Sequence, residues 1–347
     1  MIRSREFVSE SIPFDIVKSR LSPIAVLGAG AWGTAIAIAL AEAGRSVALY
    51  ARRPEHAEQM RADRENVERL AGHAFPKSLS VTSRLADAVA ASRAVFLVAP
   101  SRAIEQLARD AAAVAAPGTP FILCAKGLAA SGDFLTDRIS SIWRDGPVLV
   151  LSGPSFAHEV AARKHTILSL SGPIETARSL CSELSSEEFV IAPCSDQRGV
   201  QLAGVFKNVA AILCGASDGL KSGSNARAAL MSEAIREASE LVAGVGGDQA
   251  TLLGPAGFGD FALTCTDEQS RNYRLGRALA KGGKEVSTQE GAANAAALLR
   301  RAQDMDVDVP LVAAVVDLIS GRIDAKGAVR AAFAQRLAKS RQLRCAA

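Results

Sequence analysis

The stretch IAVLGAGAWGTAIAIALAEAG, residues 24–44, decides the fold of this 347-residue chain. It begins as a short apolar strand, turns at glycines in the spacing GxGxxG, and continues as an apolar helix. Gly28 permits the tight turn, Gly30 lets the backbone approach a pyrophosphate, and Gly33 allows the helix to pack closely on the strand. Free amides at the helix start then hold the anion. The stretch predicts a Rossmann-type dinucleotide-binding unit, and a purely structural βαβ turn is the alternative.

The end of the second predicted strand favours NADPH over NADH. A site that prefers NAD usually places Asp or Glu there, about 20 residues past the glycines, to bind the ribose hydroxyls. This chain instead reads LYARRPE over residues 49–55, with Arg52 and Arg53 in that place. Arginine suits a 2′-phosphate, so we expect NADPH to be preferred and NADH to be usable. The alternative is a solvated basic turn, which needs an acid from elsewhere, and the sequence offers no candidate for it.

The patterning divides the chain into two main parts. Up to about residue 197, short β-rich runs alternate with helical stretches, which predicts a mainly parallel sheet covered by helices on both faces. Beyond that point only helical spacing continues. We therefore expect an N-terminal extension over residues 1–22, a Rossmann-like α/β domain over 23–197, and an all-α substrate and catalytic domain over 198–347. Such a layout places the substrate in the crevice between the domains.

Composition argues against several classes of function. The 40 Lys+Arg and 36 Asp+Glu give a net charge of +4 without a concentrated run of one sign, so we expect no nucleic-acid partner. The six cysteines form no CxxC pair and the four histidines show no ligand spacing, which predicts reduced thiols and no metal site. The first twenty residues lack an apolar segment of signal-peptide length, so we expect a cytoplasmic protein without membrane insertion.

A lysine lies inside an otherwise apolar helical stretch, VFKNVAAIL, residues 205–213. A buried, unpaired ammonium is costly, so Lys207 should have a partner or a lowered pKa, unless it snorkels to solvent as most lysines do. A second lysine, Lys126 in CAKGL, follows a predicted strand at the carboxyl edge of the sheet, where ligands collect. Both lysines are therefore candidates for a substrate site.

Two further stretches combine small residues with charge, as a phosphate-ester site requires. LSGPSFAHE (151–159) follows the next strand, and PAGFGDFALTCTDEQSRN (255–272) places Asp260 on a glycine-flanked loop and Arg271 just before a helix. Arginine offers a fork of donors to phosphate, and a helix start adds amides and a favourable dipole. The first of these stretches, taken alone, could be an ordinary turn.

Taken in order, these motifs resemble the signature of the NAD(P)-dependent sn-glycerol-3-phosphate dehydrogenases of the soluble bacterial type, over about residues 24 to 330. The resemblance implies reversible reduction of dihydroxyacetone phosphate to sn-glycerol 3-phosphate, which feeds glycerophospholipid synthesis, and it implies a homodimer. The motifs that carry it are Gly28-Ala-Gly-Ala-Trp-Gly33, Lys126-Gly-Leu, Ser152-Gly-Pro-Ser-Phe-Ala157, Phe206-Lys-Asn208, Gly257-Phe-Gly-Asp260, Thr264-Cys-Thr266 and Gln269-Ser-Arg-Asn272.

The resemblance also implies roles for single residues. Lys207 matches the family's proton-transferring lysine and Lys126 its substrate- and cofactor-contacting lysine, while Asp260 is expected to orient Lys207. Burial and the charge of Lys126 should lower the pKa of Lys207. The expected substrate-binding residues are Lys126, Gly153, Ser155, Lys207, Asp260, Ser270, Arg271 and Asn272. The expected cofactor-binding residues are Gly28, Gly30, Ala31, Trp32, Gly33, Arg52, Arg53, Lys126, Ala157, Arg271 and Glu290.

Two departures from the family pattern lie on the cofactor side. The chain has TQEG at 288–291 where the family often has Val-Val-Glu-Gly, and Arg69 takes the place of a tyrosine before a Leu-Pro-Gly turn. We expect them to affect the choice between NADH and NADPH, and to leave the reacting groups unchanged.

Two other functions stay open at this point. One is a related β-hydroxyacid or 6-phosphogluconate-type dehydrogenase, against which the cluster Ser270–Asn272 and the GFGD loop weigh. The other is a non-catalytic NADP-sensing module that kept the fold and lost catalysis. The intact Lys126, Lys207 and Asp260 weigh against that second alternative.

Overall fold

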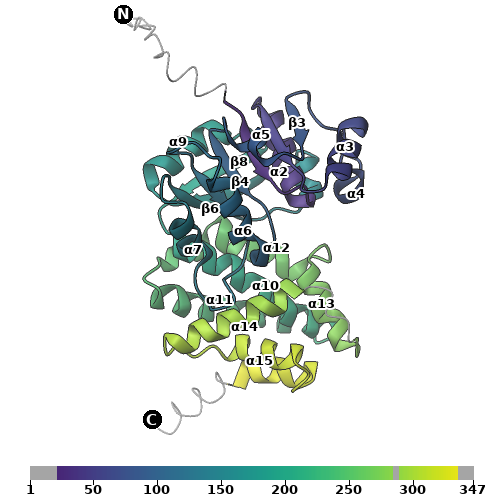
Figure 1. Ribbon diagram of the computed structural model, residues 1–347. Coiled ribbons are helices and arrows are strands. Elements are labelled where there is room, and N and C mark those ends of the chain that lie inside the picture. Colours follow the sequence, from purple (N-terminus) through teal and green to yellow (C-terminus); the bar gives the residue numbers. More distant parts are fainter. Residues whose placement is uncertain (1–21, 284–288, 335–347) are drawn as a thin grey trace, which may run out of the picture.

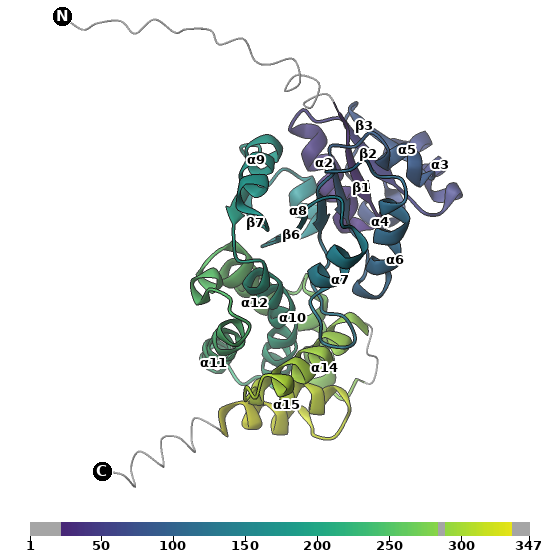
Figure 2. The same cartoon turned by 60° about the vertical axis from the view of Figure 1, so that its left-hand side comes forward.

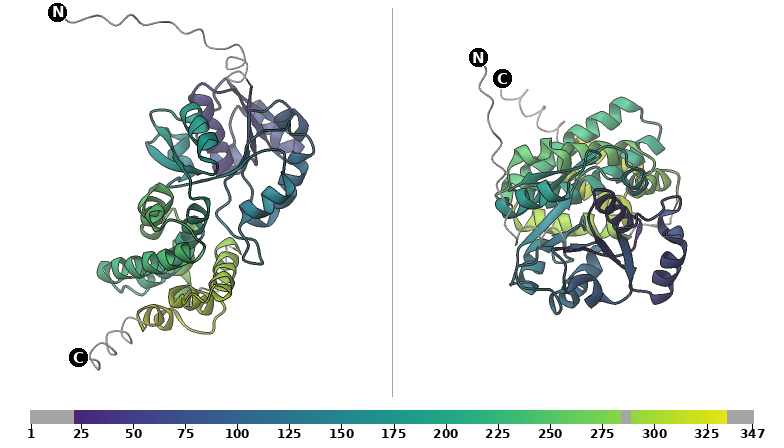
Figure 3. Two further views of the ribbon diagram at one scale, coloured as in Figure 1. Left: turned by 90° about the vertical axis from the view of Figure 1, so that its left-hand side faces the viewer. Right: turned by 90° about the horizontal axis from the view of Figure 1, so that it is seen from above.

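The computed structural model describes residues 22–283 and 289–334. Most of the expected extension 1–22, and the end of the expected domain 198–347, therefore lie outside the described residues. Figure 1 shows an α/β part above a helical part, and the side view in Figure 3 shows the same stacking. The predicted fold class, a Rossmann-like domain followed by an all-α region, is confirmed.

The α/β part is built on one eight-stranded sheet of order β3-β2-β1-β4-β5-β6-β7-β8. Neighbouring strands are parallel except for β6 and β7, which pair antiparallel. The carboxyl ends of β1, β4, β5 and β6 consequently share one edge of the sheet. The strands are β1 (Ile24–Leu27), β2 (Val47–Tyr50), β3 (Leu79–Thr82), β4 (Ala94–Leu97), β5 (Phe121–Leu123), β6 (Val148–Ser152), β7 (Thr166–Ser171) and β8 (Phe189–Cys194).

Helices cover both faces of this sheet, which explains why its central strands are apolar throughout. Along β1, Ile24 and Val26 pack into one core cluster while Ala25 and Leu27 pack into the other, because successive side chains point to opposite faces. One face carries α2 (Ala31–Glu42), α3 (Pro54–Asp63), α4 (Val67–Leu70), α8 (Ala157–Ala161) and α9 (Ile174–Leu184); the other carries α5 (Leu85–Val89), α6 (Ser101–Ala112) and α7 (Leu135–Ile142).

The helical part is arranged around α10 (Gln197–Gly219), which begins three residues after β8 ends. Figure 2 shows α10 running beneath β6, with α11, α12 and α14 beside it. Nearly every residue of α10 from Gly199 to Ser217 is buried. The other helices are α11 (Ser224–Gly244), α12 (Asp260–Thr266), α13 (Arg271–Ala280), α14 (Gln289–Asp304) and α15 (Pro310–Ile319), with short turns η1 (Gln249–Leu253) and η2 (Pro255–Gly259).

Glycines let α13 approach α10 closely. A Cβ on Gly276 would lie 1.8 Å from the carbonyl oxygen of Ile212, and a Cβ on Gly215 would lie 2.0 Å from that of Tyr273. The two helices therefore pack backbone against backbone, which fixes the position of α10 relative to the start of α13.

Among the described helices, α10 alone is long and apolar enough to cross a membrane. However, 94% of its most apolar 18-residue segment is buried inside the molecule, as in the core helix of a globular fold.

Candidate active site

The glycine turn after β1 has the geometry that a pyrophosphate requires. Gly28 has a φ of +128°, and a Cβ there would lie 1.9 Å from the carbonyl oxygen of Val98. A Cβ on Gly33 would lie 1.9 Å from the carbonyl oxygen of Gly28, whereas one on Gly30 would meet nothing within 4 Å. No side chain caps the start of α2. The amides of the first turn therefore have no side-chain acceptor among the described residues, which suits a bound anion.

The turn after β2 differs from the prediction in one respect. Arg52 is exposed, and within the described part of the chain no hydrogen bond or ion pair engages its side chain. Arg53, in contrast, forms an ion pair with Glu68 of α4, and Arg69 pairs with the same carboxylate at 2.8 Å. The expectation that no acid reaches this turn is therefore wrong, because the fold brings one from a neighbouring helix.

Lys207 is buried with a partner, which answers the question raised by its apolar surroundings. Its Nζ donates to Asp260 Oδ1 at 2.5 Å and to Thr264 Oγ1 at 2.8 Å. The other carboxylate oxygen of Asp260 accepts from Lys126 Nζ at 2.7 Å. Asp260 is 1% exposed and Lys207 7% exposed, so Lys207 does not snorkel to solvent. One buried carboxylate therefore joins the two lysines that the sequence singled out.

Three separate elements supply this cluster. Lys126 lies in the loop after β5, Lys207 lies in the middle of α10, and Asp260 is the first residue of α12. Gly204, about one turn before Lys207, lets α10 approach the end of β6, because a Cβ there would lie only 3.1 Å from Ser152 Oγ. The cluster therefore lies where the carboxyl edge of the sheet meets the helical part.

Burial dominates the ionisation of Lys207. Desolvation lowers its pKa most, the charge of Asp260 raises it, and the positive charge of Lys126 lowers it; together these effects bring the pKa from the ordinary value of 10.5 to about 8. A pKa near 8 lets the group both hold and release a proton close to neutral pH.

The loop after β6 also contacts Lys126. The ammonium donates to the carbonyl oxygen of Gly153 at 3.0 Å and lies 3.4 Å from Ser155 Oγ, which itself donates to that carbonyl at 2.9 Å. Gly153 has a φ of +151°, and a Cβ there would lie 2.9 Å from the Cα of Leu168. The loop continues to Ala157, the first residue of α8.

The start of α13 carries the predicted phosphate-binding residues. The hydroxyl of Ser270 caps the helix by accepting from the amide of Tyr273 at 3.2 Å. Arg271 is exposed, while Asn272 Oδ1 is buried and has no hydrogen-bond partner in the part of the chain that the structure describes. Within the described residues, no hydrogen bond or ion pair joins this helix start directly to the lysine cluster. The side chain of Glu290, predicted to contact the cofactor, lies outside the described part.

Two residues at this site were not assigned a role from the sequence. Thr264 lies one turn after Asp260 on α12, a spacing that could have suggested it. Asn294 of α14 is 2% exposed and donates from Nδ2 to the backbone oxygen of Lys126 at 2.9 Å. Nothing in the local sequence around Asn294 indicates this contact.

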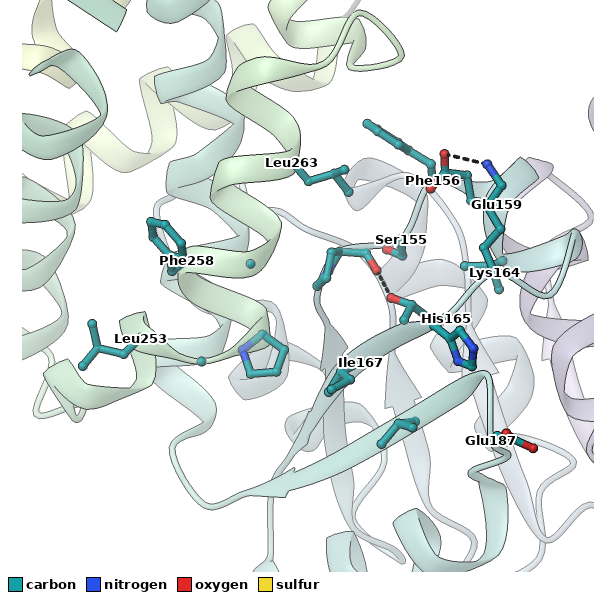
Figure 4. Close-up of a pocket in the computed structure, with 17 residues that line it drawn as sticks. Ser155, Phe156, Glu159, Lys164, His165, Ile167, Glu187, Leu253, Phe258 and Leu263 are labelled. Atoms are coloured by element: carbon teal, nitrogen blue, oxygen red, sulfur yellow. Dashed lines mark hydrogen bonds and ion pairs between the residues drawn. The ribbon is translucent and has the colours of Figure 1, made fainter. Parts of the chain in front are cut away.

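A mainly apolar groove of about 720 Å³ is lined by the Ser155 loop together with residues of β7, η1 and η2. Figure 4 shows the side chains of Leu253 and Phe258 on one side of it and Ile167 on the other. These three side chains are 80%, 52% and 48% exposed, respectively, and none of the bridged lysines lines the groove.

Comparison with known proteins gives a consistent result over most of the chain. Residues 23–177 match the model of the N-terminus of NAD-dependent glycerol-3-phosphate dehydrogenase, and residues 196–330 match that of its C-terminus. A glycerol-3-phosphate dehydrogenase [NAD(P)+] of Azorhizobium caulinodans is 38% identical over 91% of this chain and 98% of its own length. One from Halorhodospira halophila is 40% identical over 89% of this chain and 96% of its own length.

A solved structure agrees with these sequence matches. The crystal structure of glycerol-3-phosphate dehydrogenase from Coxiella burnetii superposes with a TM-score of 0.83 at 36% identity, covering 89% of this chain and 98% of that one. Both halves of the chain are matched by the family, and in the expected order. The chain therefore belongs to the NAD-dependent glycerol-3-phosphate dehydrogenase family.

Proposed function

We propose that this protein interconverts dihydroxyacetone phosphate and sn-glycerol 3-phosphate with NAD(P)H, and that the product feeds glycerophospholipid synthesis. The observation that carries the proposal is the buried bridge from Lys126 through Asp260 to Lys207 at the carboxyl edge of the sheet. A bound nicotinamide supplies the hydride, so the chain itself needs to bind the substrate and move one proton. A lysine with a pKa of about 8 suits that second task.

Each polar group of the site has a defined task in this proposal. Lys207 donates a proton to the C2 oxygen when the ketone is reduced and accepts it when the alcohol is oxidised. Asp260 orients Lys207 and separates the two ammonium groups. Lys126 and Ser155 bind substrate oxygens. The backbone at Gly153 shapes the loop that holds them.

The phosphate of the substrate binds at the start of α13 in this proposal. Arg271 offers a charged fork of donors, and the helix dipole adds a favourable field. Ser270 and Asn272 complete the pocket, and the partnerless Asn272 Oδ1 supports the presence of a ligand or water there.

For the cofactor, we infer that NADPH is preferred and NADH is also used. The exposed side chain of Arg52, which has no hydrogen-bond or ion-pair partner among the described residues, supports a contact with the 2′-phosphate; Arg53 lies beside it and is paired with Glu68. The remaining cofactor contacts come from the glycine turn with Ala31 and Trp32, and from Lys126, Ala157, Arg271 and Glu290.

The proposal is tested by following the absorbance of NADPH in the presence of dihydroxyacetone phosphate. We expect oxidation that depends on this substrate, and slower or absent oxidation with β-ketoacids or with ribulose 5-phosphate and CO2. Turnover with one of these rival substrates and not with dihydroxyacetone phosphate would assign the protein to another dehydrogenase class. Absence of turnover with every substrate, in protein that still binds NADPH, would indicate a sensor.

We also infer that the protein is a cytoplasmic homodimer without membrane insertion, and that its two domains divide at about residue 197. The groove beside the Ser155 loop supports the dimer, because exposed apolar side chains gather there and a second copy would bury them.

The dimer is tested by light scattering during size-exclusion chromatography. Wild-type protein should elute with about twice the mass of one chain, and Leu253→Asp combined with Phe258→Asp should elute as a monomer at micromolar concentration. Val67→Asp is the control, since Val67 is 55% exposed but does not line the groove. A dimer that survives the double substitution would place the interface elsewhere.

A further inference from the structure

The turn after β2 carries an ion-pair cluster that the mechanism does not use. The Glu68 carboxylate binds the guanidinium of Arg53, pairs with Arg69 at 2.8 Å, and lies 3.8 Å from His56 Nε2. The hydrogen bond from Arg53 lowers the pKa of Glu68, so the carboxylate is ionised at neutral pH. One acid therefore offsets part of the positive charge at this turn.

The helix that carries Glu68 is fixed to the glycine turn. Asn66 is fully buried, and its Nδ2 donates to the backbone oxygen of Ala29 at 3.1 Å and to Thr34 Oγ1 at 2.8 Å. Its Oδ1 accepts from the amide of Arg69 at 3.3 Å and so caps α4. The position of the Glu68 carboxylate beside the end of β2 is thus set by the cofactor turn itself.

Glu68 lies beside the end of β2, where a Rossmann domain contacts the ribose group at which NADH and NADPH differ. In a Rossmann domain the adenosine ribose lies at the end of the second strand, where an acid binds the 2′-hydroxyl of NAD and an arginine binds the 2′-phosphate of NADP. The present chain has both groups there, and they are bound to each other. A carboxylate repels the 2′-phosphate and also holds the arginine that would attract it.

We propose that Glu68 is a specificity-determining residue that sets the ratio between NADPH and NADH use. Bound to Arg53, it withholds that guanidinium from the 2′-phosphate and offers an acceptor to the ribose hydroxyl of NADH. The advantage of NADPH then depends chiefly on Arg52. This inference rests on the proposed function for the class of cofactor.

The test replaces Glu68 with glutamine and measures binding of two adenosine fragments by titration calorimetry. Adenosine 2′,5′-bisphosphate and 5′-AMP differ only in the 2′-phosphate, and their binding does not depend on catalysis. We expect E68Q to bind the bisphosphate more tightly and 5′-AMP no more tightly, raising the affinity ratio about 3- to 10-fold, the size of one exposed charge contact. The ratio of kcat/KM for NADPH to that for NADH should rise in parallel.

Two comparisons separate this role from a merely structural one. Glu58→Gln breaks a similar exposed ion pair, with Arg61 on α3, and should leave the affinity ratio unchanged. In an Arg53→Gln background, Glu68→Gln should raise the ratio less than it does alone, because the arginine it releases is absent.

An unchanged ratio in E68Q protein that binds both fragments would overturn the inference. An equal rise in E58Q would overturn it as well. Loss of binding of both fragments and of the dinucleotides by the wild-type protein would instead count against the proposed function.

Discussion

Replacing Lys207 with methionine is expected to lower kcat by about 10²- to 10⁴-fold, the range that a positioned general acid or base contributes. Methionine fits the buried site on α10 and leaves Asp260 paired with Lys126, so the fold should persist. Steady-state kinetics in both directions measure the loss, and thermal melting and NADPH binding check that the protein is otherwise intact.

The pH dependence of kcat tests whether Lys207 is the group that transfers the proton. Because the pKa of Lys207 is about 8, the ammonium form dominates below that pH and the neutral amine above it. Reduction requires the acid, so its kcat should fall as the pH rises through about 8, while the kcat of oxidation should rise over the same interval. K207M should lose both inflections. Lys77→Met, at an exposed lysine, is the control and should behave as wild type; near-normal kcat in K207M would refute the assignment.

The second large effect is expected at Asp260. Asparagine at this position leaves two lysines side by side without their shared counter-charge, and breaking a buried pair in this way costs about 3 to 5 kcal/mol of unfolding free energy. Since Asp260 raises the pKa of Lys207, its loss should lower that pKa below 8 and move the fall in reductive kcat to lower pH.

The stability cost of D260N should itself depend on pH. A lysine whose folded-state pKa is lowered destabilises the protein most at low pH, where it is charged in both states, and the penalty fades as pH rises toward the unfolded value of 10.5. Above about pH 8, Lys207 is neutral in wild type and variant alike, so the part of the difference due to Lys207 should vanish there. Denaturant titrations at pH 6.5 and 9 measure it. Asp110→Asn, on the surface of α6, is the control. If D260N loses the same free energy of unfolding at both pH values, Lys207 does not contribute to the loss as described.

The glycine turn was predictable because its chemistry is local. Six consecutive residues, Gly28 to Gly33, determine both the backbone path and the free amides. The strand before them and the helix after them are apolar enough to be predicted from the sequence alone. The same is true of α10, whose length and apolar faces indicate a core helix. In each case the residues that form the structural feature are neighbours in the sequence, so the local pattern is sufficient to predict it.

The contacts that complete the site are of a different kind. Asp260 lies 53 positions from Lys207, and Asn294 lies 168 positions from the Lys126 carbonyl to which it donates. No periodicity along the chain encodes such pairs, since they depend on how α12 and α14 dock against the sheet. Glu68 was missed for the same reason, because the acid comes from α4 and not from the end of β2.

If Lys207 transfers the proton as proposed, the Asp260 bridge also couples that transfer to the relative position of the two parts of the molecule. Lys126 belongs to the sheet part and Lys207 to the helical part, so any hinge opening would draw the two ammonium groups apart and let water reach Lys207. Hydration and the removal of a like charge both make that amine more basic. An open molecule would thus hold its proton tightly, and only closure would make Lys207 acidic enough to release it.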